Sequence, residues 1–174
     1  MTTPDVIYAD KHDNVIGSGS IGYAVEQGII RRVVQIFLID GAGSLLLQRR
    51  SAHSYAFPLR WNASATGHVD VGETYEEAAY REMKEEIDVD DVALKEVGKI
   101  FIEEDEEGYL KSFAMLYVGT SAKRQTVPDY HEVSEMRWFP IVDIVKWIER
   151  TPDDFTPSFG GGLEFFLARQ SSGV

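Results

Sequence analysis

The sequence predicts a mixed α+β or α/β sandwich in one domain, and three observations lead to this prediction. Strand patterns precede a helical pattern at residues 74–87, more strand patterns follow it, and helical patterns close the chain. The run Arg31–Ile39 (RRVVQIFLI) is rich in β-branched residues, which is typical of a buried strand. The 174 residues are enough for one sizeable core, and no internal repeat or long linker divides them. We therefore expect residues 1–174 to form a single domain.

The first half of the chain contains the strands that precede the central helix. Turn residues separate them: Asp13-Asn14, the glycine- and serine-rich stretch 17–22, and Asp40–Gly43, which has the composition of a hairpin turn. Residues 51–60 are expected to be a loop. The expected strands are Val6–Ala9, Val15-Ile16, Arg31–Ile39, Ser44–Arg50 and Trp61–Thr66.

The second half begins with the helix at 74–87, where Thr74 and Glu77 have the spacing of a capping box. An acidic turn at 105–108 joins two further strands, and a loop at 120–134 leads to a last one. Gly160-Gly161-Gly162 lacks a following Lys-Ser/Thr, so we interpret it as a turn and not as a phosphate loop. The expected elements are strands Leu94–Glu104, Tyr109–Gly119 and Glu135–Phe139, and helices Ile141–Arg150 and Gly162–Gln170.

Composition narrows the classes of partner. The formal net charge is −12, which disfavours a nucleic-acid polymer, although a divalent cation can bridge an acidic protein and a small phosphorylated ligand. The chain contains no cysteine, so disulfides, thiolate ligands and cysteine nucleophiles are excluded. No apolar run is long enough for a membrane span, and the first residues do not have the pattern of a secretory signal. We expect a cytoplasmic protein.

The helix at 74–87 carries an unusual concentration of carboxylates. At about 100° per residue, Glu82, Glu85 and Glu86 project into one arc, which also contains Ala78. A solvated charged face is the ordinary explanation of such a run. Here, however, the basic residues lie to one side, and converging carboxylates raise each other's pKa unless a cation neutralises them. Hard cations such as Mg²⁺ prefer clustered carboxylate oxygens, so the spacing leaves a metal site and a solvated face both open.

The stretch 67–89, GHVDVGETYEEAAYREMKEEIDV, resembles the Nudix box, G-x5-E-x7-R-E-U-x-E-E-x-G-U, in which U is aliphatic. Every fixed position matches except one, where Asp88 replaces the usual glycine. Outside the box, Glu132, Glu135 and Trp138 form a Glu-x-x-Glu-x-x-Trp stretch that also resembles this family. The segments 48–51, 65–69 and 155–157 are similar to the branch of the family that also contains isopentenyl-diphosphate isomerase. The resemblance covers most of the chain and is specific in the box.

This resemblance implies a Nudix-type α/β/α sandwich with a mixed β-sheet and a Mg²⁺-dependent hydrolase that cleaves a diphosphate linkage, commonly in a nucleoside diphosphate joined to another moiety. Mn²⁺ is an alternative ion, and a homodimer is a possible assembly. The resemblance makes Glu82, Glu85 and Glu86 the metal-binding and catalytic residues. It adds the backbone carbonyl of Gly67 as a further metal contact and Glu73 with Arg81 as structural support.

Several candidates stay open around this core of the site. Glu82 is our first choice as general base, with Glu132 or one of the acidic residues between Glu103 and Glu107 as alternatives. His68 is either a residue that binds metal or substrate at the site or a hydrogen-bonded loop residue. Alternation along the strand places Arg49 and Arg50 on opposite faces of the sheet, so one of the two is a candidate for binding substrate phosphate. Trp61 and Phe57 could stack on a base or line the pocket, but core packing is the preferred interpretation of both.

Two other functions compete with hydrolysis. An isopentenyl-diphosphate isomerase needs a cysteine in the strand ahead of the box, where this chain has Trp61-Asn62-Ala63-Ser64, and serine is a far poorer acid–base group. A binding module that has kept the fold and lost catalysis is the other alternative. Only Asp88 favours it, while the three intact glutamates oppose it. We expect Asp88 to tolerate the positive φ that ends the helix, at a modest local cost.

Overall fold

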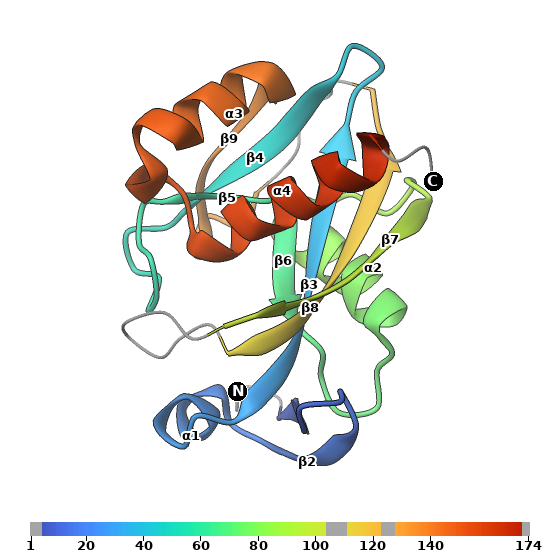
Figure 1. Ribbon diagram of the computed structural model, residues 1–174, viewed down its shortest axis with the longest axis vertical. Coiled ribbons are helices and arrows are strands. Elements are labelled where there is room, and N and C mark those ends of the chain that lie inside the picture. Colours follow the sequence, from blue (N-terminus) through green and yellow to red (C-terminus); the bar gives the residue numbers. More distant parts are fainter. Residues whose placement is uncertain (1–4, 104–110, 123–127, 172–174) are drawn as a thin grey trace.

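Nine strands form one mixed sheet between helices in the computed structural model, which describes residues 5–103, 111–122 and 128–171 (Figure 1). The strands are β1 (Val6–Ala9), β2 (Val15–Gly19), β3 (Ile30–Ile39), β4 (Ser44–Arg50), β5 (Trp61–Asn62), β6 (Ala65–His68), β7 (Leu94–Ile102), β8 (Ser112–Thr120) and β9 (Val133–Pro140). The helices are α1 (Ile21–Glu26), α2 (Tyr75–Ile87), α3 (Ile141–Arg150) and α4 (Pro157–Ser171), with a 3₁₀ turn at Pro152–Asp154.

Strand β3 is the centre of the sheet. It runs parallel to β8 from Arg31↔Ser112 to Ile39↔Thr120, and it pairs antiparallel with β6 over Val33–Ile36 on its other edge. Strand β1 pairs with β3 and extends that edge. Strand β4 pairs antiparallel with both β5 and β9. Helices pack on both faces of the sheet at β3, which explains the continuous apolar run in its sequence.

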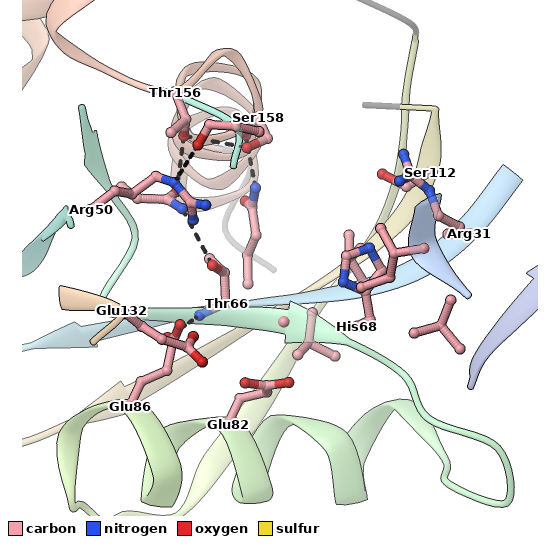
Figure 2. Close-up of a pocket in the computed structure, with 18 of the residues that line it drawn as sticks. Arg31, Arg50, Thr66, His68, Glu82, Glu86, Ser112, Glu132, Thr156 and Ser158 are labelled. Carbon is pink, nitrogen blue, oxygen red and sulfur yellow. Dashed lines mark hydrogen bonds between the residues drawn. The ribbon is translucent and has the colours of Figure 1, made fainter. Parts of the chain in front are cut away.

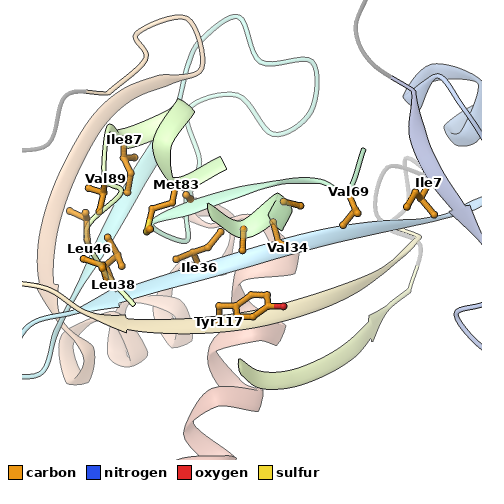
Figure 3. Close-up of a cluster of buried hydrophobic side chains, with 14 residues drawn as sticks. Ile7, Val34, Ile36, Leu38, Leu46, Val69, Met83, Ile87, Val89 and Tyr117 are labelled. Atoms are coloured by element: carbon orange, nitrogen blue, oxygen red, sulfur yellow. The ribbon is translucent and has the colours of Figure 1, made fainter. Parts of the chain in front are cut away.

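Alternation along β3 divides the core into two layers. Val34, Ile36 and Leu38 pack with the apolar face of α2, including Met83 and Ile87 (Figure 3). Phe37 points to the opposite face, where it meets α4: its ring lies 5.7 Å from that of Phe159 and 5.6 Å from that of Phe166. Helix α2 therefore covers one face of the sheet, and α3 with α4 covers the other, which is the predicted α/β/α sandwich.

Helix α2 follows its sequence signals. Thr74 is the N-cap, and it forms the predicted capping box with Glu77 in both directions. The helix ends at Asp88, which adopts the left-handed conformation with φ 53° and ψ 44°. The Asp88 carboxylate accepts a hydrogen bond from Lys84 Nζ at 2.6 Å. Ala78, which lies one turn before Glu82 on this helix, is fully buried and packs in the core with Met83 and Ile87.

Residues 17–22 are not the turn region that their glycines and serines predicted. Strand β2 continues to Gly19, since it pairs with β1 from Val6↔Gly19 onward. Ser20 then caps α1, its side chain accepting a hydrogen bond from the backbone N–H of Tyr23. Tertiary pairing with β1 has overridden the local turn preference of this stretch.

Helix α4 begins at Pro157, five residues ahead of the predicted start at Gly162. Gly160–Gly162, expected to be a turn, lies inside this helix. A Cβ on Gly162 would stand 2.1 Å from Gln35 Oε1, so glycine allows α4 to approach β3 closely. Packing against the sheet, which sequence alone does not reveal, outweighs the low helix propensity of three glycines.

Other boundaries differ by less. The expected strand Trp61–Thr66 is divided into β5 and β6 at Ala63-Ser64. The acidic turn 105–108, the strand ends at Glu104 and Tyr109, and the middle of the 120–134 loop lie outside the described residues. Within the described residues, no helix is both long and apolar enough to cross a membrane.

Candidate active site

A cavity of about 460 Å³ opens beside α2 and collects side chains from distant parts of the chain. Figure 2 shows three groups around it: Glu82 and Glu86 on α2 below, Arg50 with Thr156 and Ser158 at one end, and Arg31 with His68 and Ser112 at the other. Its size lies in the range usual for small-molecule sites. The carboxylates thus lie between two ends of the cavity that each contain an arginine.

The three glutamates of the helix have different surroundings. Glu82 and Glu86 are buried, with 9 % and 5 % of their surface exposed, whereas 61 % of the Glu85 side chain is exposed. Glu86 Oε2 accepts hydrogen bonds from Gln48 Nε2 at 2.9 Å and from the backbone N–H of Thr66 at 2.8 Å. Only neutral groups therefore bond Glu86 directly among the described residues.

Arg81 organises the loop ahead of the helix. Its Nε and Nη2 bind the two oxygens of Glu73 at 2.7 and 2.9 Å, and Nη2 also donates to the His68 carbonyl. Nη1 donates to Glu82 Oε1 at 2.7 Å and to Glu85 Oε2 at 3.1 Å. Arg81 thereby joins the box glutamates to the loop, which is the arrangement expected for the Glu73–Arg81 pair.

Gly67 packs directly against the Glu82 carboxylate. A Cβ added at Gly67 would lie 1.9 Å from Glu82 Cδ, far closer than two non-bonded carbon atoms can approach. Gly67 belongs to β6, which pairs with β3 at Val34↔Gly67, so it cannot move away without breaking the sheet. The missing side chain leaves room for the Glu82 carboxylate at the cavity.

Burial of the two carboxylates disfavours their charged form. Burial raises the pKa of Glu82 to about 7, against the lowering effect of Arg81. Burial raises the pKa of Glu86 well above its ordinary value, and the negative charge of Glu82 adds to the effect. Two neighbouring carboxylates with raised pKa values form a site that gains by binding a cation.

The donor set fits a hard divalent cation. It consists of carboxylate oxygens, the type of ligand that Mg²⁺ and Mn²⁺ prefer. Within the described residues, no three His, Asp or Glu side chains are already gathered as a complete metal cage. Mg²⁺ does not require such a cage, because it is usually held by one or two carboxylates together with water and substrate phosphate. Glu82 and Glu86 can supply those carboxylates, with the more exposed Glu85 beside them.

Arg49 and Arg50 lie on opposite faces of the strand, as alternation predicted. Arg50 lines the cavity, and its Nε donates to the Ala56 carbonyl at 2.9 Å. Burial lowers its pKa, while the charges of Glu86 and Glu132 oppose that shift. Arg49 is directed elsewhere, toward the Leu59 carbonyl and Glu135. Of the two, Arg50 is placed to meet an anion in the cavity.

His68 lines the cavity at the end opposite Arg50 (Figure 2). Burial, together with the positive charges of Arg31, Arg50 and Arg81, lowers its pKa to about 3. The imidazole is therefore neutral at physiological pH, and it faces arginines instead of joining the carboxylates. His68 thus lines the cavity as a neutral imidazole, and its role as a ligand stays a prediction.

The other candidates separate clearly. Glu132 lines the cavity and points toward Glu86, so it remains the nearest alternative base (Figure 2). Glu103 is exposed and does not line the cavity, and residues 104–107 lie outside the described part of the chain. Trp61 packs in the core as expected. Phe57 does not, because it lines the cavity from the loop after β4.

Sequence reasoning missed a polar group at the start of α4. Thr156 Oγ1 donates to Asn62 Oδ1 at 2.9 Å, and Asn62 Nδ2 donates to Thr66 Oγ1 at 3.3 Å. Gln35 Nε2 donates to the Ser158 carbonyl at 2.9 Å, which ties α4 to β3. These residues are far apart in the chain and no motif spacing joins them. The available signals were the polar Gln35 within an otherwise apolar strand pattern and the similarity of segments 65–69 and 155–157 to the isomerase branch.

Comparison with known proteins places these features in a family. The model of the NUDIX domain matches residues 29–159, which contain helix α2 and the cavity-lining strands β3 and β6. An isopentenyl-diphosphate Delta-isomerase 2 from Photorhabdus laumondii is 32 % identical over 156 residues, covering 88 % of this chain and 87 % of that protein. An uncharacterized Nudix hydrolase from Pseudomonas aeruginosa is 35 % identical over 99 residues, covering 57 % of this chain and 59 % of that protein.

Solved structures agree at the level of the fold. A crystal structure of a Deinococcus radiodurans protein superimposes with a TM-score of 0.71 at 26 % identity, covering 84 % of this chain and 89 % of that one.

Proposed function

The chain belongs to the Nudix hydrolase family, whose members act on diphosphate bonds, and from this premise we propose that it is a Mg²⁺-dependent hydrolase of a small diphosphate compound. Mn²⁺ is the alternative ion. The observation that carries the proposal is the pair Glu82 and Glu86, two buried carboxylates with raised pKa values at the edge of one cavity. Such a pair gains from a counter-charge, which a divalent cation supplies while it also binds the anionic diphosphate.

Each residue of the site then has a chemical task. When bound, the cation neutralises charge on the diphosphate oxygens and makes water a better nucleophile. Glu82, Glu85 and Glu86 hold the ion, with the Gly67 carbonyl as a further contact. Arg81 keeps Glu82 and the loop in place through its four partners. Arg50 binds a phosphate oxygen, since a guanidinium matches that geometry.

Glu82 is our proposed general base, with Glu132 as the alternative. Glu82 is oriented by Arg81 Nη1 at 2.7 Å and by the close approach of Gly67, so its position is well defined. Glu132 is more exposed and lies on the segment before β9, from which it can reach the cavity. The two assignments differ in consequence: loss of the base lowers kcat, whereas loss of a peripheral carboxylate changes KM.

Isomerisation of isopentenyl diphosphate is the competing activity, because relatives carry that name. Ser64 stands nearest in sequence to the place where an isomerase needs its cysteine. It is fully buried, its Oγ donates to the Leu46 carbonyl, and it accepts a hydrogen bond from the Leu38 N–H. A hydroxyl engaged in this way has no role in proton transfer at the cavity, which argues for hydrolysis over isomerisation.

The substrate class expected from the resemblance is a nucleoside diphosphate joined to another moiety, and these compounds form the first panel to assay. The test incubates the protein with Mg²⁺ and nucleoside diphosphate derivatives, dinucleoside polyphosphates and alkyl or prenyl diphosphates. Released phosphate and organic product are measured for the wild type and for Glu82→Gln and Glu86→Gln. We expect turnover that falls by about 10²–10⁴-fold in these variants, the range for loss of a catalytic acid–base or metal-site group.

Lys84→Gln is the matched control, because Lys84 is exposed on the same helix and pairs with Asp88 and Asp90, away from the cavity. Turnover that survives both glutamate changes at the wild-type rate contradicts the proposal, as does the absence of turnover for every compound. Conversion of isopentenyl diphosphate to its isomer would support the competing activity instead.

A further inference from the structure

Gln48 is a buried amide that touches the site from behind. Only 1 % of its surface is exposed, and it lies near the end of β4. Its Nε2 donates to Glu86 Oε2 at 2.9 Å. Glu86 lines the cavity, whereas Gln48 is not among the described residues that do so. Any effect of Gln48 on the chemistry of the site therefore passes through Glu86.

Alternation along β4 explains why this side chain meets helix α2. Leu46, two residues earlier, packs in the core layer beneath α2, and Arg50, two residues later, lines the cavity. Leu45 and Leu47 point to the opposite layer of the core. Gln48 thus stands on the face toward α2, at the point where the apolar core ends and the charged cavity begins.

Two neutral donors fix one oxygen of Glu86. The amide of Gln48 comes from β4, and the backbone N–H of Thr66, at 2.8 Å, comes from β6 (Figure 2). Within the described part of the chain, the hydrogen bonds to this carboxylate all end at Oε2 and none reaches Oε1. The sheet therefore holds Oε2 in place and leaves Oε1 for a ligand in the cavity.

The neutrality of Gln48 matters as much as its N–H group. Buried Asp13 shows the alternative, because Arg32 Nε at 2.7 Å and Lys99 neutralise it inside the protein. An amide donates a hydrogen bond without adding a positive charge, so Glu86 keeps its attraction for an external cation. The hydrogen-bond partners behind a metal-binding carboxylate orient it and tune its affinity for the ion.

We propose that Gln48 is a positioning residue that sets the affinity of the site for a divalent cation, because it orients Glu86 and leaves the carboxylate charge to the ion. The inference rests on the proposed function, in which Glu86 helps to hold the ion. It makes two separate demands on position 48. Loss of the donor loosens the carboxylate, whereas a positive charge competes with the ion for it.

The test measures binding of Mn²⁺ alone to the full chain, without substrate, and follows free Mn²⁺ by its electron paramagnetic resonance signal. Gln48→Met keeps nearly the length of the side chain and removes the donor. We expect its dissociation constant for Mn²⁺ to rise about 10–100-fold, the range for loss of an outer partner of a metal ligand. Gln48→Lys keeps a donor but adds a charge, and it should weaken binding further than Gln48→Met.

Leu46→Met is the matched control, because it changes a core residue on the same strand and face with little change of volume. It should bind Mn²⁺ like the wild type, and melting curves verify that all variants fold. The inference is overturned if Gln48→Met or Gln48→Lys binds Mn²⁺ as tightly as the wild type. It is also overturned if Leu46→Met weakens binding equally, or if the wild type binds no Mn²⁺.

Hydrolysis in Mg²⁺ gives an independent reading. Gln48→Met should need at least about tenfold more Mg²⁺ for its half-maximal rate, and excess Mg²⁺ should restore kcat. A fall in kcat that excess Mg²⁺ does not restore would overturn the inference, since a structural defect acts at every concentration of the ion. If the wild type binds Mn²⁺ and hydrolyses no compound, the proposed function fails, while the binding curves still decide the role of Gln48.

Discussion

Asp13 and Glu86 are both buried carboxylates near α2, with 8 % and 5 % of their surface exposed, but their neighbours differ in charge. Asp13 lies between two cations, Arg32 and Lys99, and also accepts the hydroxyl of Tyr75. Glu86 accepts hydrogen bonds from an amide side chain and a backbone N–H, and the nearby charge of Glu82 is negative. The fold neutralises the charge of Asp13, whereas Glu82 and Glu86 together carry more negative charge than their neighbours offset.

This difference in charge distinguishes a carboxylate that stabilises the fold from carboxylates that can bind an external cation. A carboxylate that is neutralised within the protein fixes elements to one another, and Asp13 does so for the first turn, β3, α2 and β7. Within the described part of the chain, Glu86 has no cation among its hydrogen-bond partners, and Glu82 has only Arg81, which Glu73 and Glu85 share. This pair therefore costs stability on its own and becomes favourable when an external cation binds. The comparison therefore predicts opposite consequences for the removal of charge in the two regions.

The largest expected effect follows from crowding at Glu82. Gly67→Ala places a Cβ 1.9 Å from Glu82 Cδ, so the carboxylate must leave its position at the cavity. We expect hydrolytic activity to fall about 10²-fold, because a displacement of about 1 Å at a reacting group costs that much. Gly41→Ala, where a Cβ meets nothing within 4 Å, is the control and should keep its activity. Equal rates for both variants would show that Glu82 does not need its present position.

Removing the neutralised carboxylate should destabilise the fold. Asp13→Asn leaves Arg32 and Lys99 without their shared partner, and Arg32 is largely buried. We expect the free energy of unfolding to fall by about 2–3 kcal/mol, somewhat less than for a fully buried pair since Lys99 is partly exposed. Urea denaturation measures this change, and the activity per folded molecule should remain close to that of the wild type. A loss below about 0.5 kcal/mol, the scale of an ordinary surface change, would contradict the assigned role of Asp13.

Removing the Glu82 carboxylate, whose pKa burial raises in spite of its bond to Arg81, should do the reverse in the absence of metal. The pKa of Glu82 is about 7 in the fold, above its ordinary value of 4.5, so the native state holds more protons than the unfolded state between these values. The titration of Glu82 therefore lowers the free energy of unfolding of the wild type as pH rises from 4.5 to 7. Glu82→Gln should match the wild type at pH 4.5 and exceed it by about 1–3 kcal/mol at pH 8.

Denaturation at several pH values with a chelator measures this difference between the two proteins. Saturating Mg²⁺ should stabilise the wild type at pH 8 and have little effect on Glu82→Gln. A variant that is less stable than the wild type at pH 8 without metal would mean that the Glu82–Arg81 pair outweighs the cost of burial.

The smallest effect is expected at the one position that departs from the box. Asp88→Gly relieves the strain of a left-handed residue, about 1 kcal/mol, but it makes the unfolded chain more flexible and removes the exposed contact with Lys84. These effects oppose each other, so the melting temperature should change by no more than about 2 °C, with activity unchanged. A loss of activity would show that the end of α2 controls the position of Glu86.

Helix α2 is the part of the fold that the sequence predicted best. Its capping box, its apolar face and its end at Asp88 all depend on residues within a few positions of one another. The Glu73–Arg81 ion pair, expected from the resemblance to the box, is present, whereas the roles of the glutamates stay predictions. The central strand β3 was predicted equally well, since its composition reflects burial on both faces.

Elements stabilised by distant contacts were predicted poorly. Strand β2 and helix α1 exist because β1 and the small core around Ala24 hold them, although their own residues favour turns. Helix α4 starts early and contains three glycines, because Gln35 and the sheet lie against it. Neither the choice of Arg50 over Arg49 nor the position of Phe57 follows from residues nearby in the sequence.

By itself, the sequence determined which chemistry the chain carries: a capped helix with a carboxylate face behind a glycine loop, in the spacing of the Nudix box. Spacing of this kind is local, so hydrogen bonding and helical geometry convert it directly into a set of aligned side chains. Only the tertiary structure decided what surrounds those side chains, from the burial that raises the pKa values of Glu82 and Glu86 to the arrival of Arg50 and Glu132 at the same cavity. These features depend on strand register and on contacts between segments far apart in the chain, because burial and charge balance are properties of the packed whole.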